Sequence, residues 1–128
     1  MQNLNQIRAR HVLAFAEDSL SKKIKGVNGG EVIKKIPTVI MNNGLLAALA
    51  FSMDPKNEAW ACVFSGVARH LASPEILLVD PSCTCTADLL DFLVSADSNS
   101  SVLRNVTAET MAWLEFARRL VQKKEDDR

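Results

Sequence analysis

Three cysteines and two histidines are the residues of this 128-residue chain that could bind a metal or react with an oxidant. Thiolate and imidazole are ligands that zinc prefers. Cys83 and Cys85 form a Cys-x-Cys pair, and Cys62 and His70 lie eight residues apart in the preceding segment. The pair lacks the Cys-x-x-Cys spacing of most zinc sites, and cysteine is also an ordinary small core residue. We therefore expect no metal site, and a metal-sensing or redox-sensing regulator stays a minor hypothesis.

Residues that could catalyse a reaction occur without the partners that the chemistry needs. Gly29-Gly30 is not followed by the Lys-Ser/Thr of a phosphate-binding loop, and neither GxSxG nor HExxH occurs. No histidine accompanies the carboxylates Asp88, Asp91 and Asp97. His11 falls on the apolar side of the first predicted helix, where a hydrogen-bonded core histidine is more frequent than a catalytic base. The sequence therefore predicts a protein that is not an enzyme and needs no cofactor.

Basic side chains occur in clusters whose spacing could follow a phosphate backbone. Lysine and arginine neutralise phosphates, so together such clusters could border a groove for RNA. Because few aromatic residues are spare to stack bases, we expect electrostatic binding that is independent of base sequence. For any single pair, a solvated helix face is the more common explanation. The candidate RNA-binding residues are Lys22, Lys23, Lys25, Lys34, Lys35, Arg118, Arg119 and Lys123.

The composition predicts a helical core. Apolar residues make up 48% of the chain, but only five phenylalanines and two tryptophans supply aromatic rings, and there is no tyrosine. A core built mainly from Leu, Ile, Val and Ala is typical of a helical bundle. The odd number of cysteines argues against a disulfide framework and agrees with a reducing compartment. With no signal-peptide pattern and no apolar run near the roughly 18 residues that span a membrane, we expect a cytoplasmic protein without membrane contact.

The net charge is zero, but the charges are unevenly distributed along the chain. Residues 1–53 carry seven basic and three acidic side chains, residues 54–100 carry two and seven, and residues 101–128 carry six and five. A basic first part and an acidic middle indicate two complementary faces, available for self-association or for different partners. Chance scatter over a solvated surface is the alternative explanation.

The long apolar segment of residues 36–51 allows two local structures. Asn43-Gly44 between two apolar runs is a typical hairpin signal, because both residues tolerate positive φ. The leucines and alanines that follow Gly44 favour a helix, since they are good helix formers without period-two alternation. We predict one helix from about Pro37 to Met53 with Gly44 inside it. The glycine costs about 1 kcal/mol there, which close approach of a neighbouring helix could offset.

The first half of the chain contains two further helices by its apolar spacing of three and four. A first helix is predicted from about Leu4 to Lys23. Residues 27–30 resemble a break, and a short helix from Glu31 to about Ile36 is expected to end or kink at Pro37.

The second half of the chain is predicted from its capping residues. Asn57 caps a helix that stops before Pro74, residues 75–81 form an extended connection and not a strand, and Thr86 caps a short helix. Residues 97–101 form a polar loop before the last helix, for which Thr107 is the expected N-cap and Glu109 a first-turn residue. The expected fold is all-α, a single compact bundle of about five to six helices that occupies residues 1–128 as one domain.

Two motifs stand out from this pattern of helices. The first is Ile36-Pro37-x-x-Ile40-x-x-Asn43-Gly44-Leu45, followed by an Ala/Leu run that ends in Ala50-Phe51. The second is Thr107-x-Glu109-x-Met111-Ala112-x-Leu114-x-Phe116-x-Arg118-Arg119. With the first helix, they resemble the small all-helical subunit of type III-B CRISPR effector complexes, the Cmr complexes; residues 74–86 do not align with it. The motif residues with an expected structural role are Pro37, Asn43, Gly44, Leu45, Thr107 and Glu109.

The resemblance implies a non-catalytic role in antiviral defence. Members of this family stack head to tail into a minor filament beside the subunits that hold the guide RNA, and other subunits cleave the target RNA between the two filaments. The expected partners are therefore other Cmr subunits, further copies of this chain, and guide and target RNA. A contact that repeats along a filament without closing into a ring needs two different, complementary faces on each copy. Weak contacts of each copy with RNA phosphates would add up to a higher affinity along the filament. A helical adaptor that binds a partner helix without RNA is the alternative hypothesis.

Overall fold

The chain folds into α-helices only, within the part that the structure describes. The structure is a computed structural model that describes residues 3–17, 27–95 and 98–126, with side chains for residues 3–17, 32–95 and 98–120. These residues contain no strand, which confirms the predicted all-α fold of five to six helices. The elements are α1 (Leu4–Glu17), α2 (Val27–Asn43), α3 (Leu45–Ser52), the 3-10 turn η2 (Pro55–Asn57), α4 (Glu58–Ala72), α5 (Thr86–Val94) and α6 (Ser100–Asp126).

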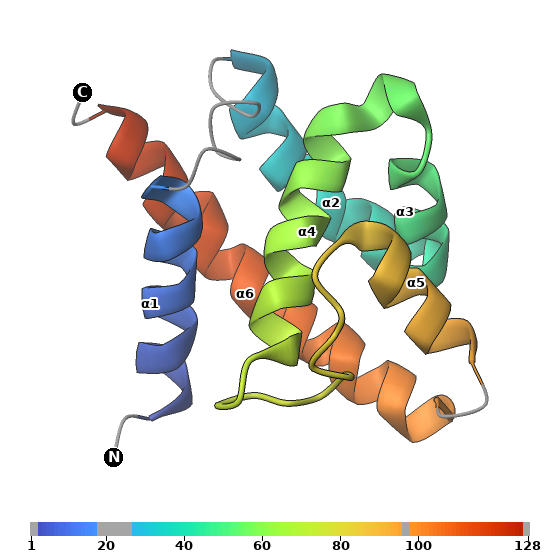
Figure 1. The fold of residues 1–128 in the computed structure, drawn as a ribbon. Coiled ribbons are helices and arrows are strands. Elements are labelled where there is room, and N and C mark those ends of the chain that lie inside the picture. The colour runs from blue at the N-terminus through green and yellow to red at the C-terminus, as the bar shows by residue number, and fades with distance from the viewer. Residues whose placement is uncertain (1–2, 18–26, 96–97, 127–128) are drawn as a thin grey trace.

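Helix α4 lies at the centre and contacts each of the other five described α-helices. α1 lies on one side of it, α3 and α5 lie on the other, and the long helix α6 crosses behind it (Figure 1). A helix surrounded in this way must be apolar nearly all round. The sequence meets this demand, since Val63, Phe64, Val67 and Leu71 are fully buried and even His70 is 2% exposed.

Helix α2 passes through Pro37 without a break. The predicted break at residues 27–30 and the separate helix from Glu31 are therefore wrong, because α2 begins at Val27 and ends at Asn43. A proline inside a helix removes one backbone hydrogen bond and costs about 3 kcal/mol. Ile33, Ile36 and Ile40 are all buried on one face of α2, and this buried stripe offsets the cost.

Gly44 separates α2 from α3, so the predicted continuous helix from Pro37 to Met53 is also wrong. The glycine has φ 89° and ψ 161°, a combination that is almost exclusive to glycine. A Cβ atom added there would meet no atom within 4 Å, so close approach of another helix is not its role. Gly44 supplies a sharp turn between two helices and not a hairpin between strands.

Helix α6 begins earlier than the capping residues predict. Its first residue is Ser100, so the polar loop is shorter than predicted, and Asn99 Oδ1 accepts a hydrogen bond of 3.0 Å from the backbone N–H of Val102. Thr107 lies inside the helix and donates its hydroxyl hydrogen to the Leu103 carbonyl at 2.7 Å. The assignment of Thr107 as N-cap and of Glu109 to the first turn is therefore wrong, because Asn99 provides an earlier cap.

Two other predicted caps have different partners. Asn57 directly precedes α4, but its side-chain amide donates to the Phe51 carbonyl at 2.9 Å and makes no capping bond. Thr86 is the first residue of α5, and its hydroxyl donates to the Ala61 carbonyl in α4 at 3.0 Å. Both side chains therefore tie neighbouring elements together.

The connection from α4 to α5 is not a strand, as its sequence predicts, but it begins with a turn at residues 74–76 and is not extended throughout. Residues 75–81 form no strand, and the Leu78 N–H donates to the Leu71 carbonyl at 3.0 Å. Val79 is buried against the core, whereas Leu77 is exposed with φ 45°. None of the described helices is both long and apolar enough to cross a membrane.

Candidate functional site

The predicted RNA-binding residues fall into three groups in the structure. Lys34 and Lys35 are exposed on α2, and Arg118 and Arg119 are exposed on α6. The other four lie outside the described residues or have side chains that the structure does not describe: Lys22, Lys23, Lys25 and Lys123. The buried stripe of α2 holds that helix in the core, and the two lysines beside the stripe lie at the surface.

A hollow of about 510 Å³ lies next to the two lysines of α2. We call it the α2–α3 groove. It exists because the turn at Gly44 folds α3 back against α2, and α4 closes the hollow with Trp60. Its lining residues are Lys34, Lys35, Thr38, Val39, Asn43, Ala47, Phe51 and Trp60.

Two aromatic rings meet in the α2–α3 groove. The rings of Phe51 and Trp60 have centroids 4.7 Å apart and an interplanar angle of 66°, an edge-to-face contact. Trp60 is 9% exposed, whereas Phe51 is 50% exposed. The Asn57 amide donates to the backbone carbonyl of Phe51, and the contact with Trp60 orients the ring.

The lining of the groove carries cationic side chains. Two lysines and no acidic residue occur among its described lining residues. Helix geometry puts Thr38 one turn after Lys34 and Val39 one turn after Lys35, so α2 presents charge and then uncharged groups along the hollow. Such a surface can attract an anion at one end and hold an apolar or aromatic group at the other.

Arg118 and Arg119 do not line this groove. Each arginine forms an ion pair with Glu115, with N–O distances of 2.9 Å. These exposed pairs hold the two side chains only weakly, because solvent-exposed ion pairs are worth about 0–1 kcal/mol. The structure therefore brings Lys34 and Lys35 together in one site with Asn43 but does not add the arginines of α6 to it.

A second polar arrangement, the buried ion cluster, joins α1, α4 and α6. Glu109 accepts hydrogen bonds from Arg8 Nε and Nη2, both at 2.7 Å, and faces His70 Nε2 at 2.9 Å. His70 Nδ1 lies 2.7 Å from His11 Nδ1, and His11 Nε2 lies 3.2 Å from Glu75. The Glu109 and His70 side chains are 7% and 0% exposed. His11 is therefore a partnered histidine in the helix interface, as its place on the apolar stripe predicts.

The cluster changes the pKa of both buried members. Burial by itself raises the pKa of Glu109, but the hydrogen bonds from Arg8 and His70 outweigh it, so the pKa lies below its ordinary value. Burial lowers the pKa of His70, and the nearby His11 and Arg8 add to this effect against the opposing pull of Glu109. At neutral pH Glu109 is therefore ionised and His70 is neutral.

These charge states assign the protons between the rings. A neutral His70 carries one N–H, and Nε2 must hold it to donate to the Glu109 carboxylate. Its Nδ1 is then an acceptor, and His11 Nδ1–H is the donor across the 2.7 Å contact. The contact between the two rings joins α1 to α4.

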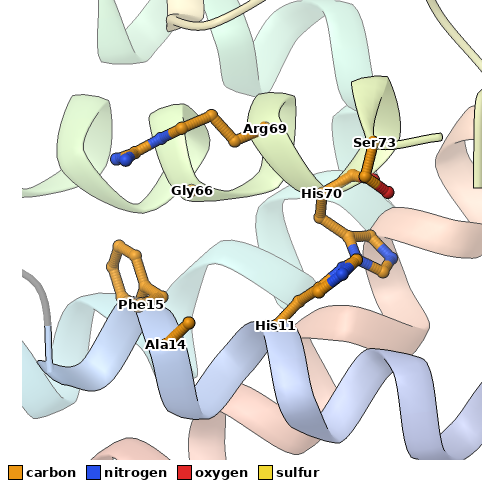
Figure 2. A pocket seen from close by; sticks show the side chains of 7 residues that line it. All are labelled: His11, Ala14, Phe15, Gly66, Arg69, His70 and Ser73. Carbon is orange, nitrogen blue, oxygen red and sulfur yellow. The ribbon is translucent and has the colours of Figure 1, made fainter. Parts of the chain in front are cut away.

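A small pocket of about 180 Å³ lies beside the two histidines, between α1 and α4 (Figure 2). Figure 2 shows the His11 and His70 rings meeting at one end and Phe15 opposite Gly66 at the other. A Cβ atom on Gly66 would lie 2.6 Å from Phe15 Cδ1, so only glycine allows this approach. Gly66 thus has the close-packing role that the sequence suggests for Gly44.

The cysteine and histidine candidates for a metal site do not converge. Both nitrogens of His70 face other partners in the buried ion cluster. Cys62 and Cys83 are buried, and burial followed by the charge of Asp80 raises the pKa of the Cys83 thiol. Within the described residues, no group of three or more His, Cys, Asp or Glu side chains is arranged to hold a metal ion.

Comparison with known proteins decides the family. The family model described as "CRISPR-associated protein (Cas_Cmr5)" matches residues 4–124. The chain belongs to the Cas_Cmr5 family. It is therefore a CRISPR-associated subunit of the Cmr type and associates with other Cmr subunits, which confirms the resemblance drawn from its two motifs. None of the curated proteins and none of the solved structures compared with the chain matches it.

From the sequence of this Cas_Cmr5 chain, the lysines of the α2–α3 groove are predicted as candidate RNA-binding residues. The aromatic residues of the groove and the buried ion cluster are not predicted. Phe51 and Trp60 lie nine residues apart and meet because the turn at residues 53–57 brings the start of α4 against the end of α3. Glu109 carried a signal, since it lies three residues after Val106 and four before Trp113, both of which are buried. A carboxylate on a buried helix face requires a cationic partner, which here is Arg8.

Proposed function

We propose that this chain is a non-catalytic structural subunit of a type III-B CRISPR effector ribonucleoprotein that acts in antiviral defence in the cytoplasm. It would form the minor filament that flanks the guide and target RNA, by head-to-tail contact with further copies of itself and with other Cmr subunits. Membership of the Cas_Cmr5 family supports the assembly role. Other subunits would then cleave the target RNA.

The observation that carries the RNA contact is the α2–α3 groove with its cationic side chains. Lys34 and Lys35 are both exposed and both line the groove. Lysines in such a position can neutralise phosphates and release counterions. Because each copy contributes few charges, a single chain binds RNA weakly and a filament binds it through many copies.

The uneven charge supports self-association. Acidic side chains outnumber basic ones by seven to two in residues 54–100, whereas residues 1–53 are basic. A head-to-tail contact needs two different complementary faces on each copy, and opposite charges provide them.

The test is a charge reversal in the groove. Lys34→Glu with Lys35→Glu is compared with Lys56→Glu with Arg104→Glu, which changes the net charge equally at exposed positions outside the groove. Fluorescence anisotropy with labelled single-stranded RNA at low and physiological salt measures binding. The groove variant should lose affinity and have a smaller salt dependence, while the control variant behaves like the native chain.

Two other results would contradict the proposal. Equal RNA binding by all three proteins would remove these lysines from the RNA contact. If the groove variant binds RNA normally but no longer joins the Cmr complex, the groove binds a protein, as the adaptor hypothesis requires.

A further inference from the structure

We infer that the α2–α3 groove is a nucleobase-binding site, in which one unstacked base of single-stranded RNA lies against Phe51 while the adjoining phosphates contact Lys34 and Lys35. The inference rests on the proposed RNA contact and adds to it a defined ligand, a single nucleotide. It also changes the expectation that RNA binding is purely electrostatic, because stacking of the base on Phe51 would contribute to the affinity.

The size of the hollow suits a nucleotide. Its volume of about 510 Å³ falls within the range of roughly 300–1,000 Å³ that is typical of small-ligand sites. Trp60 of α4 lines one side of the hollow and is itself 9% exposed. A hollow of this volume has room for a single base.

Phe51 is the stacking surface. Half of its accessible area remains open to solvent, so one part of the ring is available for a base to stack on. Its edge-to-face contact with Trp60 and the hydrogen bond to its carbonyl from Asn57 hold it in place. A ring that is already fixed loses little conformational entropy when a base stacks on it.

Polar groups in the groove can pair with the edge of the base. Thr38 contributes a hydroxyl and Asn43 a carboxamide, and each group can both donate and accept hydrogen bonds. Such groups tolerate different bases, which suits a subunit that must accept any target sequence. Phosphates on either side of the extruded base would lie near Lys34 and Lys35 at the basic end of the groove.

The balance of polar and apolar lining favours a base over the side chains of a partner helix. Four of the eight lining residues are polar or cationic, namely Lys34, Lys35, Thr38 and Asn43. A groove for an amphipathic helix presents a longer apolar stripe that receives side chains from successive turns. A flat heterocycle with a polar edge and a charged backbone uses all of these groups at once.

The experiment compares ordinary RNA with abasic RNA of the same length, which keeps the phosphates and removes the bases. Binding to the full chain is measured by fluorescence anisotropy at low salt. The native chain should prefer the ordinary RNA by about tenfold, the effect of one stacked base. Phe51→Leu keeps apolar volume against Trp60 and should lose the preference, whereas Phe51→Trp should keep it. Val94→Ala, at an exposed apolar position outside the groove, is the control and should change nothing.

The possible results separate the two proposals. Equal binding of both RNAs by the native chain, with Phe51→Leu unchanged, would overturn the nucleobase site and leave the phosphate contact intact. Absence of binding to either RNA at low salt would overturn the proposed function as well. Loss of Cmr-complex assembly in Phe51→Leu, with native preference for ordinary RNA, would assign the groove to a partner protein and overturn the inference.

Discussion

Glu109 accepts two hydrogen bonds of 2.7 Å from Arg8, although 101 residues separate the two in the sequence. The pair joins α1 to α6 next to His70 of the central helix α4. A buried carboxylate that loses its cation leaves an uncompensated charge, which is far more costly than the loss of an exposed pair. The cluster therefore fixes the position of the first helix on the rest of the bundle.

Glu109→Gln should destabilise the protein by about 3 kcal/mol, near the lower limit for a broken buried pair, because Arg8 retains some contact with water. Urea unfolding followed by circular dichroism measures the loss. Glu115→Gln is the matched control, since it removes the exposed pairs with Arg118 and Arg119 and should not change stability measurably. Equal stability of the two variants would mean that the buried ion cluster does not hold α1.

Stability should decrease as the pH falls below the ordinary histidine pKa of 6.5. Burial lowers the pKa of His70 in the folded state, so the unfolded chain takes up this proton first and the free energy of unfolding falls. Glu109 acts in the same direction at lower pH. Its folded pKa lies below the ordinary 4.5, so its contribution is present above that value and is lost as the pH falls further.

Urea unfolding just above and about one unit below the ordinary pKa of histidine tests the role of His70. His70→Gln keeps an amide N–H for Glu109 but does not titrate. The variant should lose most of the stability difference between these two pH values. A difference as large as that of the native chain would assign the pH dependence to another group.

Gly66→Ala should destabilise the protein by about 1–3 kcal/mol, because the added Cβ atom would overlap the Phe15 ring at 2.6 Å. Gly66→Ala combined with Phe15→Leu relieves the overlap and should cost less than the sum of the two single changes. Thermal unfolding of the four proteins provides the comparison. Additive effects would show that the glycine is not required by the approach of α1 to α4.

Gly44→Ala should destabilise by about 1–3 kcal/mol through backbone strain alone, since nothing lies within 4 Å of the new methyl group. Gly44→Asn should be no better, because asparagine favours the left-handed helical region and not the extended region at φ 89° and ψ 161°. Urea unfolding of the isolated chain detects this effect. Normal stability with defective assembly would move the role of Gly44 to a contact between subunits.

The fold class could be predicted from the sequence, but several helix boundaries could not. The leucine and alanine content after Gly44 predicts a helix there, and α3 confirms it. Pro37 and Thr107 misled the prediction because local preferences for a helix start were overridden by the buried stripe of α2 and by an earlier cap at Asn99. At Pro37 tertiary packing overrides a local preference, whereas at Thr107 a second local signal, the cap at Asn99, sets the start of the helix.

The candidate site could be predicted only in part for a related reason. The charge and spacing of Lys34 and Lys35 are visible in the sequence, and both residues are exposed in the structure. The hollow beside them depends on the angle between α2 and α3, which the backbone of Gly44 sets and no residue pattern encodes. The pairing of Arg8 with Glu109 likewise depends on which helices meet, so a single sequence cannot predict it.

The most direct test of the central claim is a tagged purification of the chain from its native cells, followed by gel filtration and end-labelling of bound nucleic acid. The proposed function predicts elution as a particle many times heavier than the 14.1 kDa chain, with a discrete set of short RNAs. The Lys34→Glu and Lys35→Glu variant should join the particle but hold target RNA more weakly. Elution of the native chain as a small protein without nucleic acid would contradict the account.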